Sequence, residues 1–179
     1  MRLSADGQEV GTRTFSIGID PRIEGVTQAD LQARFDLAVR IRDRVSDANE
    51  AVILIRDIEA QIQERLEASD DPSLAEEAQD LREDLNAVEG EIYQVRNRSN
   101  QDPLNFPIKL NNKLAALLGV VEGSEDRPTE QSYQVFQYLD GLLEIQLDLL
   151  DSVLSGSLGA FNQGLEARGL DPISVERSG

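Results

Sequence analysis

Apolar residues in the middle of this sequence recur at alternating spacings of four and three, and this periodicity most restricts the possible folds. The run is Leu74, Ala78, Leu81, Leu85, Val88, Ile92 and Val95. Such spacing places every apolar side chain on one stripe of an α-helix. A helix with one apolar stripe must bury it against other helices. The pattern therefore predicts a helical bundle.

The preceding segment has the same periodicity over a greater length. Its apolar positions are Leu31, Phe35, Ala38, Ile41, Val45, Ala48, Val52, Ile55, Ile62 and Leu66. Thr27 with Asp30 three residues later is a capping pattern, so we expect one helix of about 40 residues, roughly 60 Å long. The run "AVILI", residues 51–55, is apolar on all sides and predicts neighbours on two sides. Asp71 and Pro72 are expected to cap and begin the next helix.

Two further helices are expected. The first, about Ile108 to Val121, is short, with Leu110, Leu114, Leu117 and Leu118 facing inward. The second, about Thr129 to Arg168, is expected to bury Val135, Leu139, Leu142, Leu149, Val153, Phe161 and Leu165, with additional apolar positions at Leu143, Leu150 and Leu154. Glycines at 156, 159 and 164 indicate a bend, a close helix contact or low helicity. Gly169 and Pro172 end this helix.

These segments predict a mainly α fold, an antiparallel up-down helical bundle of two long and two shorter helices. The stripes could instead form an intermolecular coiled coil, although four helices joined by turns can satisfy one another. At the N-terminus, Leu3 and Ala5, then Phe15, Ile17 and Ile19, alternate as in two strands, with Asp6-Gly7 as the turn. We therefore expect a β-hairpin remnant at 1–22, a bundle at 23–173 and a tail at 174–179.

The residue types in the chain restrict which catalytic and metal-binding sites it can form. There is no cysteine and no histidine, which removes thiolate and imidazole nucleophiles, bases and metal ligands. Asp140, Glu144, Asp148 and Asp151 form an acidic stripe, but di-metal bundles also require histidine, so we interpret the stripe as a solvated face. "SGSLG", residues 155–159, lacks the first glycine and the base of a nucleophile elbow. Asn97-Arg98-Ser99 is a formal glycosylation sequon. No catalytic, cofactor or metal site is predicted.

The net charge is −17, from 34 acidic and 17 basic residues. This charge argues against nucleic acid and anionic membranes as partners. Apart from Lys109 and Lys113, the basic residues are arginine. Acid excess with few lysines predicts adaptation to high salt; the alternative is codon bias toward arginine on an ordinary acidic surface. No apolar run is long enough to span a bilayer, and the first ten residues lack the apolar centre of a signal peptide.

Several stretches resemble one family. "RLSADGQEVGTRTFSIGIDPR", followed by "TQADLQARFDLAVRIRD", then residues 110–132 and "GLDPI" at 169–173, resemble the C-terminal region of bacterial sortilin-like Asp-box β-propeller proteins, often labelled glycosyl hydrolases. The resemblance implies that the strands end an upstream β-sandwich, that Met1 is an internal or truncated start, and that the protein is extracellular or periplasmic. The Ser-x-Asp-x-Gly-x-Thr-Trp boxes of the propeller are missing, since the chain has no tryptophan.

This resemblance implies a non-catalytic C-terminal accessory or interaction module of a propeller protein. Its partners would be the propeller or sandwich domain of the parent protein, with self-association also expected to be possible. The alternative is an autonomous coiled-coil adaptor that binds a partner helix. In-frame Asp-box repeats upstream of Met1 would favour the first hypothesis, and a promoter there would favour the second.

Overall fold

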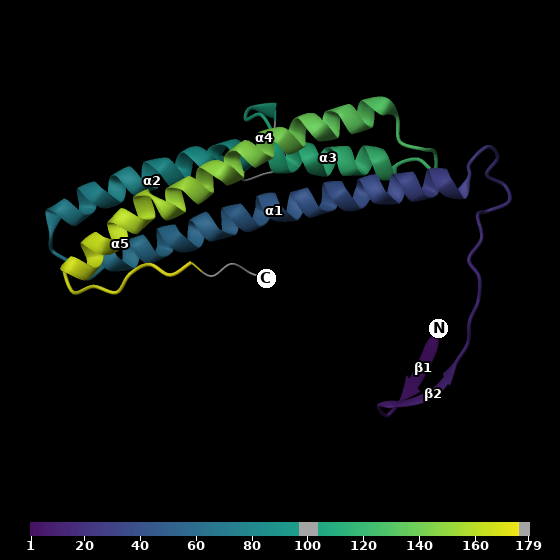
Figure 1. Cartoon of the computed structure of the whole chain (residues 1–179), viewed down its shortest axis with the longest axis horizontal. Helices are drawn as coiled ribbons and strands as arrows, with labels where there is room; N and C mark the ends of the chain where they lie inside the picture. Colours follow the sequence, from purple (N-terminus) through teal and green to yellow (C-terminus); the bar gives the residue numbers. More distant parts are fainter. Residues whose placement is uncertain (97–103, 176–179) are drawn as a thin grey trace.

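The computed structural model describes residues 1–96 and 104–175, and the fold is 67% helical. The expected mainly α bundle with an N-terminal β-hairpin is confirmed (Figure 1). The elements, in chain order, are β1 Arg2–Ala5, β2 Gln8–Thr12, α1 Gln28–Glu67, α2 Pro72–Ile92, α3 Leu110–Glu122, α4 Glu130–Ser155 and α5 Ser157–Ala167.

Local capping signals set the starts of the first two helices, as the sequence predicts. The Thr27 hydroxyl accepts a hydrogen bond from the Asp30 N–H at 3.2 Å, and the Asp30 carboxylate accepts one from the Thr27 N–H at 3.0 Å. These two bonds form a capping box, which helps to satisfy the backbone N–H groups at the start of the helix. At the second helix, the Asp71 carboxylate caps Ser73 N–H at 3.0 Å, and Pro72 is the first helical residue.

The described helices form three rows along one long axis, with α1 in the first, α2 and α3 end to end in the second, and α4 and α5 in the third (Figure 1). Later residues of α2 meet earlier residues of α1, as in the contacts from Arg82 to Gln63 and from Glu89 to Arg56. The second row is therefore antiparallel to α1. α3 also runs antiparallel to α1, since Asn111 contacts Asn49 near its start and Ser124, just after its end, contacts Arg34. The predicted alternation of direction therefore fails between α2 and α3.

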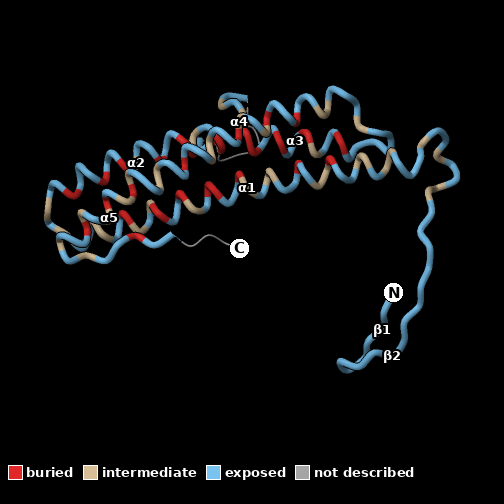
Figure 2. The backbone as a smooth tube through the Cα atoms, viewed as in Figure 1, coloured by how far each residue is buried: buried red, intermediate tan, exposed pale blue. Residues whose placement is uncertain are grey.

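Buried residues lie on the facing sides of these rows (Figure 2). The residues with no more than 1% exposure are Leu37, Ile41, Ala48, Ile55, Ile58, Ile62, Leu74, Ala78, Leu81, Leu85, Ile92, Leu114, Leu143 and Leu165. The core is thus built mainly from aliphatic side chains. Aliphatic side chains of this kind pack well between helices.

Four predicted inward positions are wrong. Phe35, Val95, Val135 and Leu149 are 62%, 51%, 45% and 48% exposed. In α4, apolar residues occur in adjacent pairs, so the periodicity is compatible with either of two buried faces. Packing buries Phe136 and Leu150 rather than Val135 and Leu149, the residues before them. Val95 lies beyond the end of α2, since Tyr93 is already extended, with φ of −129°.

The prediction of a single helix from Thr129 to Arg168 is wrong, because the structure has two helices, α4 and α5, in this range. Gly156, with φ of −97° and ψ of −86°, separates α4 from α5. A Cβ at this position would lie 3.0 Å from the backbone oxygen of Ser152, so glycine permits the close approach. After the bend, α5 packs on α2, where the Ser157 hydroxyl donates to the Asp84 carboxylate at 2.7 Å.

Arg168 joins the end of α5 to the start of α2. Its Nε is 2.8 Å from Asp71 Oδ2, and its Nη2 donates to Glu77 Oε1 and to Ser73 Oγ, each at 2.7 Å. Hydrogen bonds from Arg168, and then from Ser73, lower the pKa of the Asp71 carboxyl from 3.8 to about 2. Both partners are therefore charged at neutral pH. The helix ends as predicted, with Gly169 at φ of 74°.

The β-hairpin differs from the predicted one in its second strand. Asp6 and Gly7 form the expected two-residue turn, both with positive φ, of 51° and 77°, as a type I′ turn requires. However, the strand that follows is Gln8–Thr12, whereas residues 13–20 form neither strand nor helix. The alternation of apolar residues at Phe15, Ile17 and Ile19 therefore predicted the wrong second strand. A two-residue turn forces the residues directly after the turn to pair with β1.

Candidate functional site

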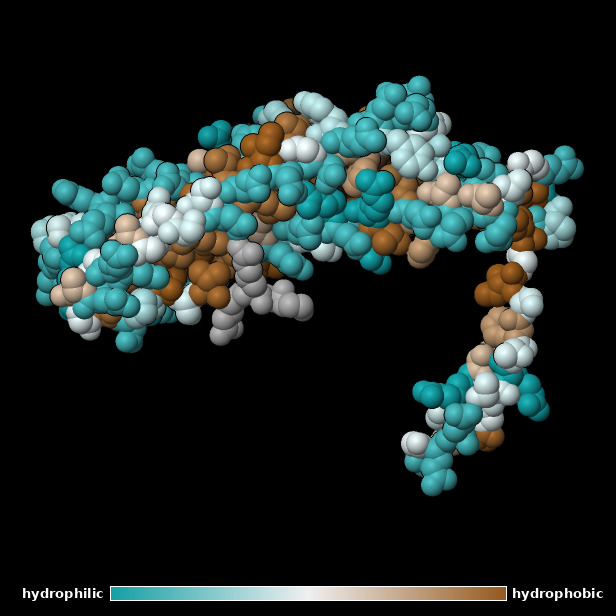
Figure 3. All heavy atoms as spheres, in the orientation of Figure 1, coloured by the Kyte–Doolittle hydropathy of each residue, from teal (hydrophilic) through white to brown (hydrophobic). Residues whose placement is uncertain are grey.

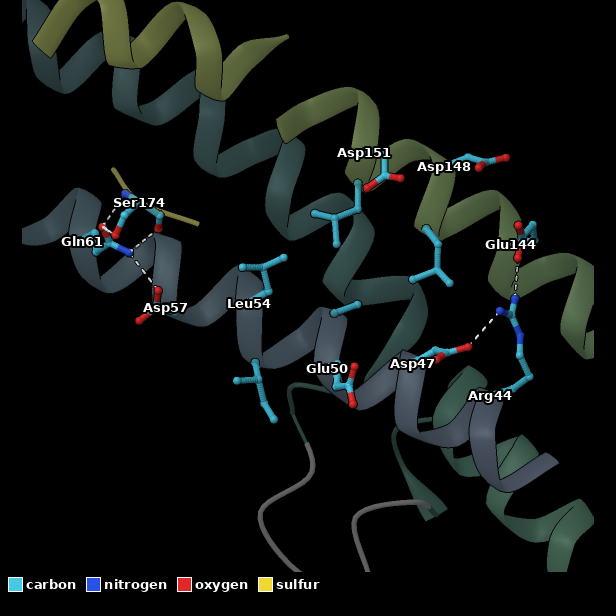
Figure 4. A pocket seen from close by; sticks show the side chains of 14 residues that line it. Arg44, Asp47, Glu50, Leu54, Asp57, Gln61, Glu144, Asp148, Asp151 and Ser174 are labelled. Carbon is cyan, nitrogen blue, oxygen red and sulfur yellow. Dashed lines mark hydrogen bonds and ion pairs between the residues drawn. The ribbon is translucent and has the colours of Figure 1, made fainter. Parts of the chain in front are cut away.

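An open groove of about 790 Å³ lies between α1 and α4 (Figure 4). Its apolar lining comes from Ala51, Ile53, Leu54, Leu147 and Leu150. Ala51 and Leu150 are buried, Leu54 and Leu147 are half-buried, and Ile53 is 66% exposed. The groove is thus apolar at its base and open to solvent.

The apolar run at residues 51–55 explains why the groove forms on α1. Val52 and Ile55 enter the core, while Ala51, Ile53 and Leu54 line the groove. The prediction that this run contacts neighbours on two sides therefore holds for Ala51 and Leu54, but Ile53 remains mostly solvent-exposed. A helix that is apolar all round and packed on only part of its circumference leaves an apolar strip in water.

Carboxylates line both sides of the groove. α1 contributes Asp47, Glu50 and Asp57, and α4 contributes Glu144, Asp148 and Asp151 (Figure 4). Among the described residues of the lining, Arg44 is the one cationic side chain. The groove therefore has a strongly negative rim around an apolar base.

Arg44 marks one end of the groove. Its Nη1 is 2.9 Å from Asp47 Oδ2, and its Nη2 is 2.6 Å from Glu144 Oε2. Arg44 Nε lies 2.6 Å from Asp140 Oδ1, but its N–H does not point at that oxygen, so this contact is ionic without being a hydrogen bond. Glu144 is exposed, as the interpretation of the acidic stripe as a solvated face predicts, but Asp140 and Glu144 also pair with Arg44 and so join α4 to α1.

The C-terminal segment marks the other end. Gln61 Nε2 donates to Ser174 O at 2.9 Å, and Gln61 Oε1 accepts from Ser174 N–H at 3.0 Å. Asn162 forms the same pair of bonds with Ile173, at 3.1 and 2.8 Å. Because Ile173 is also 4% exposed, the segment is held by both amide pairing and apolar burial.

An ion pair with a buried carboxylate lies away from the groove, between α1 and α2. Glu89 is 4% exposed, and its Oε1 accepts a hydrogen bond from Arg56 Nε at 2.7 Å. The Arg56 guanidinium also lies 5.0 Å from the centre of the Tyr93 ring. Partial burial, and then the negative charge of Glu89, raise the pKa of the neighbouring Glu59 carboxyl. This pair contributes to the pairing of the two helices rather than to an open site.

The remaining sequence motifs do not form a reactive centre in the described residues. Ser157 has its hydroxyl engaged by Asp84. Within residues 1–96 and 104–175, no group of three or more metal-ligating side chains comes together. The sequon at 97–99 lies outside the described residues. No helix in the described part of the chain is long and apolar enough to cross a membrane.

Sequence reasoning missed Arg44 and Gln61, which define the ends of the groove. Their partners Glu144 and Ser174 are 100 and 113 residues away in the chain, so no local pattern connects them. The sequence signals for this site are the all-round apolar run at residues 51–55 on α1 and the acidic stripe on α4, which the sequence does not connect.

Comparisons with protein-family models, with curated proteins and with solved structures found no match for this chain.

Proposed function

We propose that this chain is a non-catalytic C-terminal accessory module of a sortilin-like β-propeller protein, attached to the sandwich domain of that protein through its N-terminal hairpin. The observation that carries the proposal is the isolation of the hairpin. β1 and β2 contact each other and none of the described helices, and every residue of both strands is exposed (Figure 1).

Such a hairpin is poorly stable by itself, since two strands alone are marginal in water. It also leaves Leu3 and Val10 in solvent, at 62% and 63% exposure, and in the segment after it Phe15 and Ile17 are 65% and 88% exposed. Brown residues on the segment between the hairpin and α1 are conspicuous in Figure 3. Pairing of an outer strand edge with another sheet would satisfy backbone groups and cover this apolar surface.

The bundle would then project from the sandwich as a rigid arm. α1 spans 40 residues, which corresponds to about 60 Å. The sequence resemblance supports the same arrangement, because its matching motifs include both the hairpin turn and the helical region. In this arrangement the module would be extracellular or periplasmic, as the family resemblance implies.

Amide hydrogen exchange tests the attachment. In the isolated monomer, we expect the amides of β1 and β2 to exchange much faster than those in the centre of α1, because the hairpin has no packing partner among the described helices. The core amides near Ile55 serve as the internal reference. Slow exchange of the hairpin in a demonstrated monomer would mean that it docks on the bundle, and would contradict its role as an attachment point.

A second candidate function is favoured by the groove. An autonomous adaptor that binds a partner helix would need an elongated apolar surface beside exposed helices, and α1 with α4 provides one. This function does not require an upstream sandwich domain.

A further inference from the structure

We propose that the groove between α1 and α4 binds an amphipathic helix with a basic polar face, supplied by a partner protein. This inference rests on the second candidate function, the helix-binding adaptor, and adds the chemistry of the partner. It is carried by three features of the groove: its place in the bundle, its apolar base and its charge.

The place in the bundle fits a helix. The described helices form three rows, and the second row packs against both α1 and α4. A helix lying over α1 and α4 would complete a four-helix cross-section, in which each helix packs on two neighbours. Between Arg44 and Gln61, α1 advances by about 25 Å at 1.5 Å per residue. A partner helix of roughly 17 residues matches this length.

The apolar base supplies the contact area. Ile53 and Leu54 from α1 face the same groove as Leu147 from α4, and Ile53 is 66% exposed. A helix with apolar residues at positions i, i+3 or i+4, and i+7 would cover these side chains along one face. The removal of this apolar surface from water would be the main favourable contribution to binding.

The charge of the groove selects the partner. Six carboxylates line it against one guanidinium, and Arg44 is already engaged by Asp47, Asp140 and Glu144. The side-chain carboxylates of Glu50 and Asp148 have no hydrogen-bond or ion-pair partner among the described residues, and the Ser152 hydroxyl engages only the backbone oxygen of Asp148. Lysine or arginine flanking the apolar face of the partner would pair with these carboxylates. A second copy of this chain fits poorly, because its net charge is also −17.

Fluorescence anisotropy with labelled designed peptides tests the proposal. Three peptides of about 18 residues would share one leucine face and carry lysine, glutamine or glutamate on the polar face. At about 0.15 M salt, where circular dichroism confirms that the protein is folded, we expect the lysine peptide to bind at least about tenfold tighter than the glutamine peptide. We expect no measurable binding of the glutamate peptide.

Charge-reversal variants locate the binding. Glu50→Lys combined with Asp148→Lys should lower the affinity for the lysine peptide by about tenfold or more. The matched control combines Glu76→Lys with Asp80→Lys, at exposed positions of α2 outside the groove, and should change affinity by less than about twofold. Ile53→Asp, at a mostly exposed site, should weaken all helical binding without loss of helicity.

Four outcomes would contradict the proposal in different ways. Equal loss in the groove and control variants would show that attraction to net charge alone explains the binding. Equal affinity for the lysine and glutamine peptides, with loss on Ile53→Asp, would leave the helix-binding adaptor standing and overturn the basic partner. Absence of binding by every peptide would overturn both. Dimerisation that Ile53→Asp abolishes would identify a second copy as the occupant instead.

Discussion

Replacement of Ile55 by alanine is expected to lower the free energy of unfolding by about 2–5 kcal/mol. Ile55 is 0% exposed at the middle of α1, so truncation removes buried methyl and methylene groups and leaves a cavity. The loss should be visible as a lower midpoint in urea with an unchanged slope, because the surface exposed on unfolding is nearly the same.

Ile53→Ala is the matched control for this substitution. Ile53 lies two residues earlier in the same apolar run, but it is 66% exposed. Its truncation should therefore cost less than about 0.5 kcal/mol, as is usual for surface sites. Similar losses for the two variants would show that Ile53 is covered in solution and that the groove is not open.

Thermal stability is expected to rise with salt, by about 10 °C between about 0.05 M and about 3 M NaCl or KCl. The net charge of −17 on a chain of 179 residues repels itself in the compact state. Low salt leaves this repulsion acting over about 30 Å, whereas 1 M salt limits it to about 3 Å. The core is aliphatic and has little aromatic area to bury. The repulsion between charges therefore has a larger influence on the free energy of unfolding.

The control for salt adaptation is the same pair of α2 substitutions, Glu76→Lys with Asp80→Lys. They make the net charge less negative and should raise the midpoint at low salt more than at high salt, since repulsion is largely screened at high salt. A midpoint that stays flat or falls across the salt series would remove the high-salt hypothesis. Codon bias would then be the better explanation of the excess of arginine over lysine.

Helix starts were predictable because their signals are local. Thr27 and Asp30 form the expected capping box, and Asp71 and Pro72 begin α2 as their positions indicate. The buried face of α4 was not predictable, because its apolar residues occur in adjacent pairs and only contacts with α1, α2 and α3 select between them. Gly156 was recognised as a possible bend, but its effect on the direction of α5 depends on packing against α2.

The groove was less predictable than the fold. Its walls come from α1 and α4, whose closest charged contact joins Arg44 to residues about a hundred positions later. The sequence showed the acidic stripe and the apolar run at 51–55 separately, without placing them side by side. The hairpin was half predictable, since the Asp6-Gly7 turn is a local signal whereas the true second strand, Gln8–Thr12, has little apolar alternation.

The most direct test of the accessory-module proposal is the size of the native polypeptide that contains this bundle. An antibody against the folded bundle, applied to a denaturing gel of the producing cells and their medium, should detect a polypeptide several times larger than 19.8 kDa, with Asp-box peptides in its tryptic digest. Purified chain of residues 1–179 serves as the size standard. A species at 19.8 kDa throughout, with no larger precursor, would contradict the accessory module and leave the autonomous helix-binding adaptor.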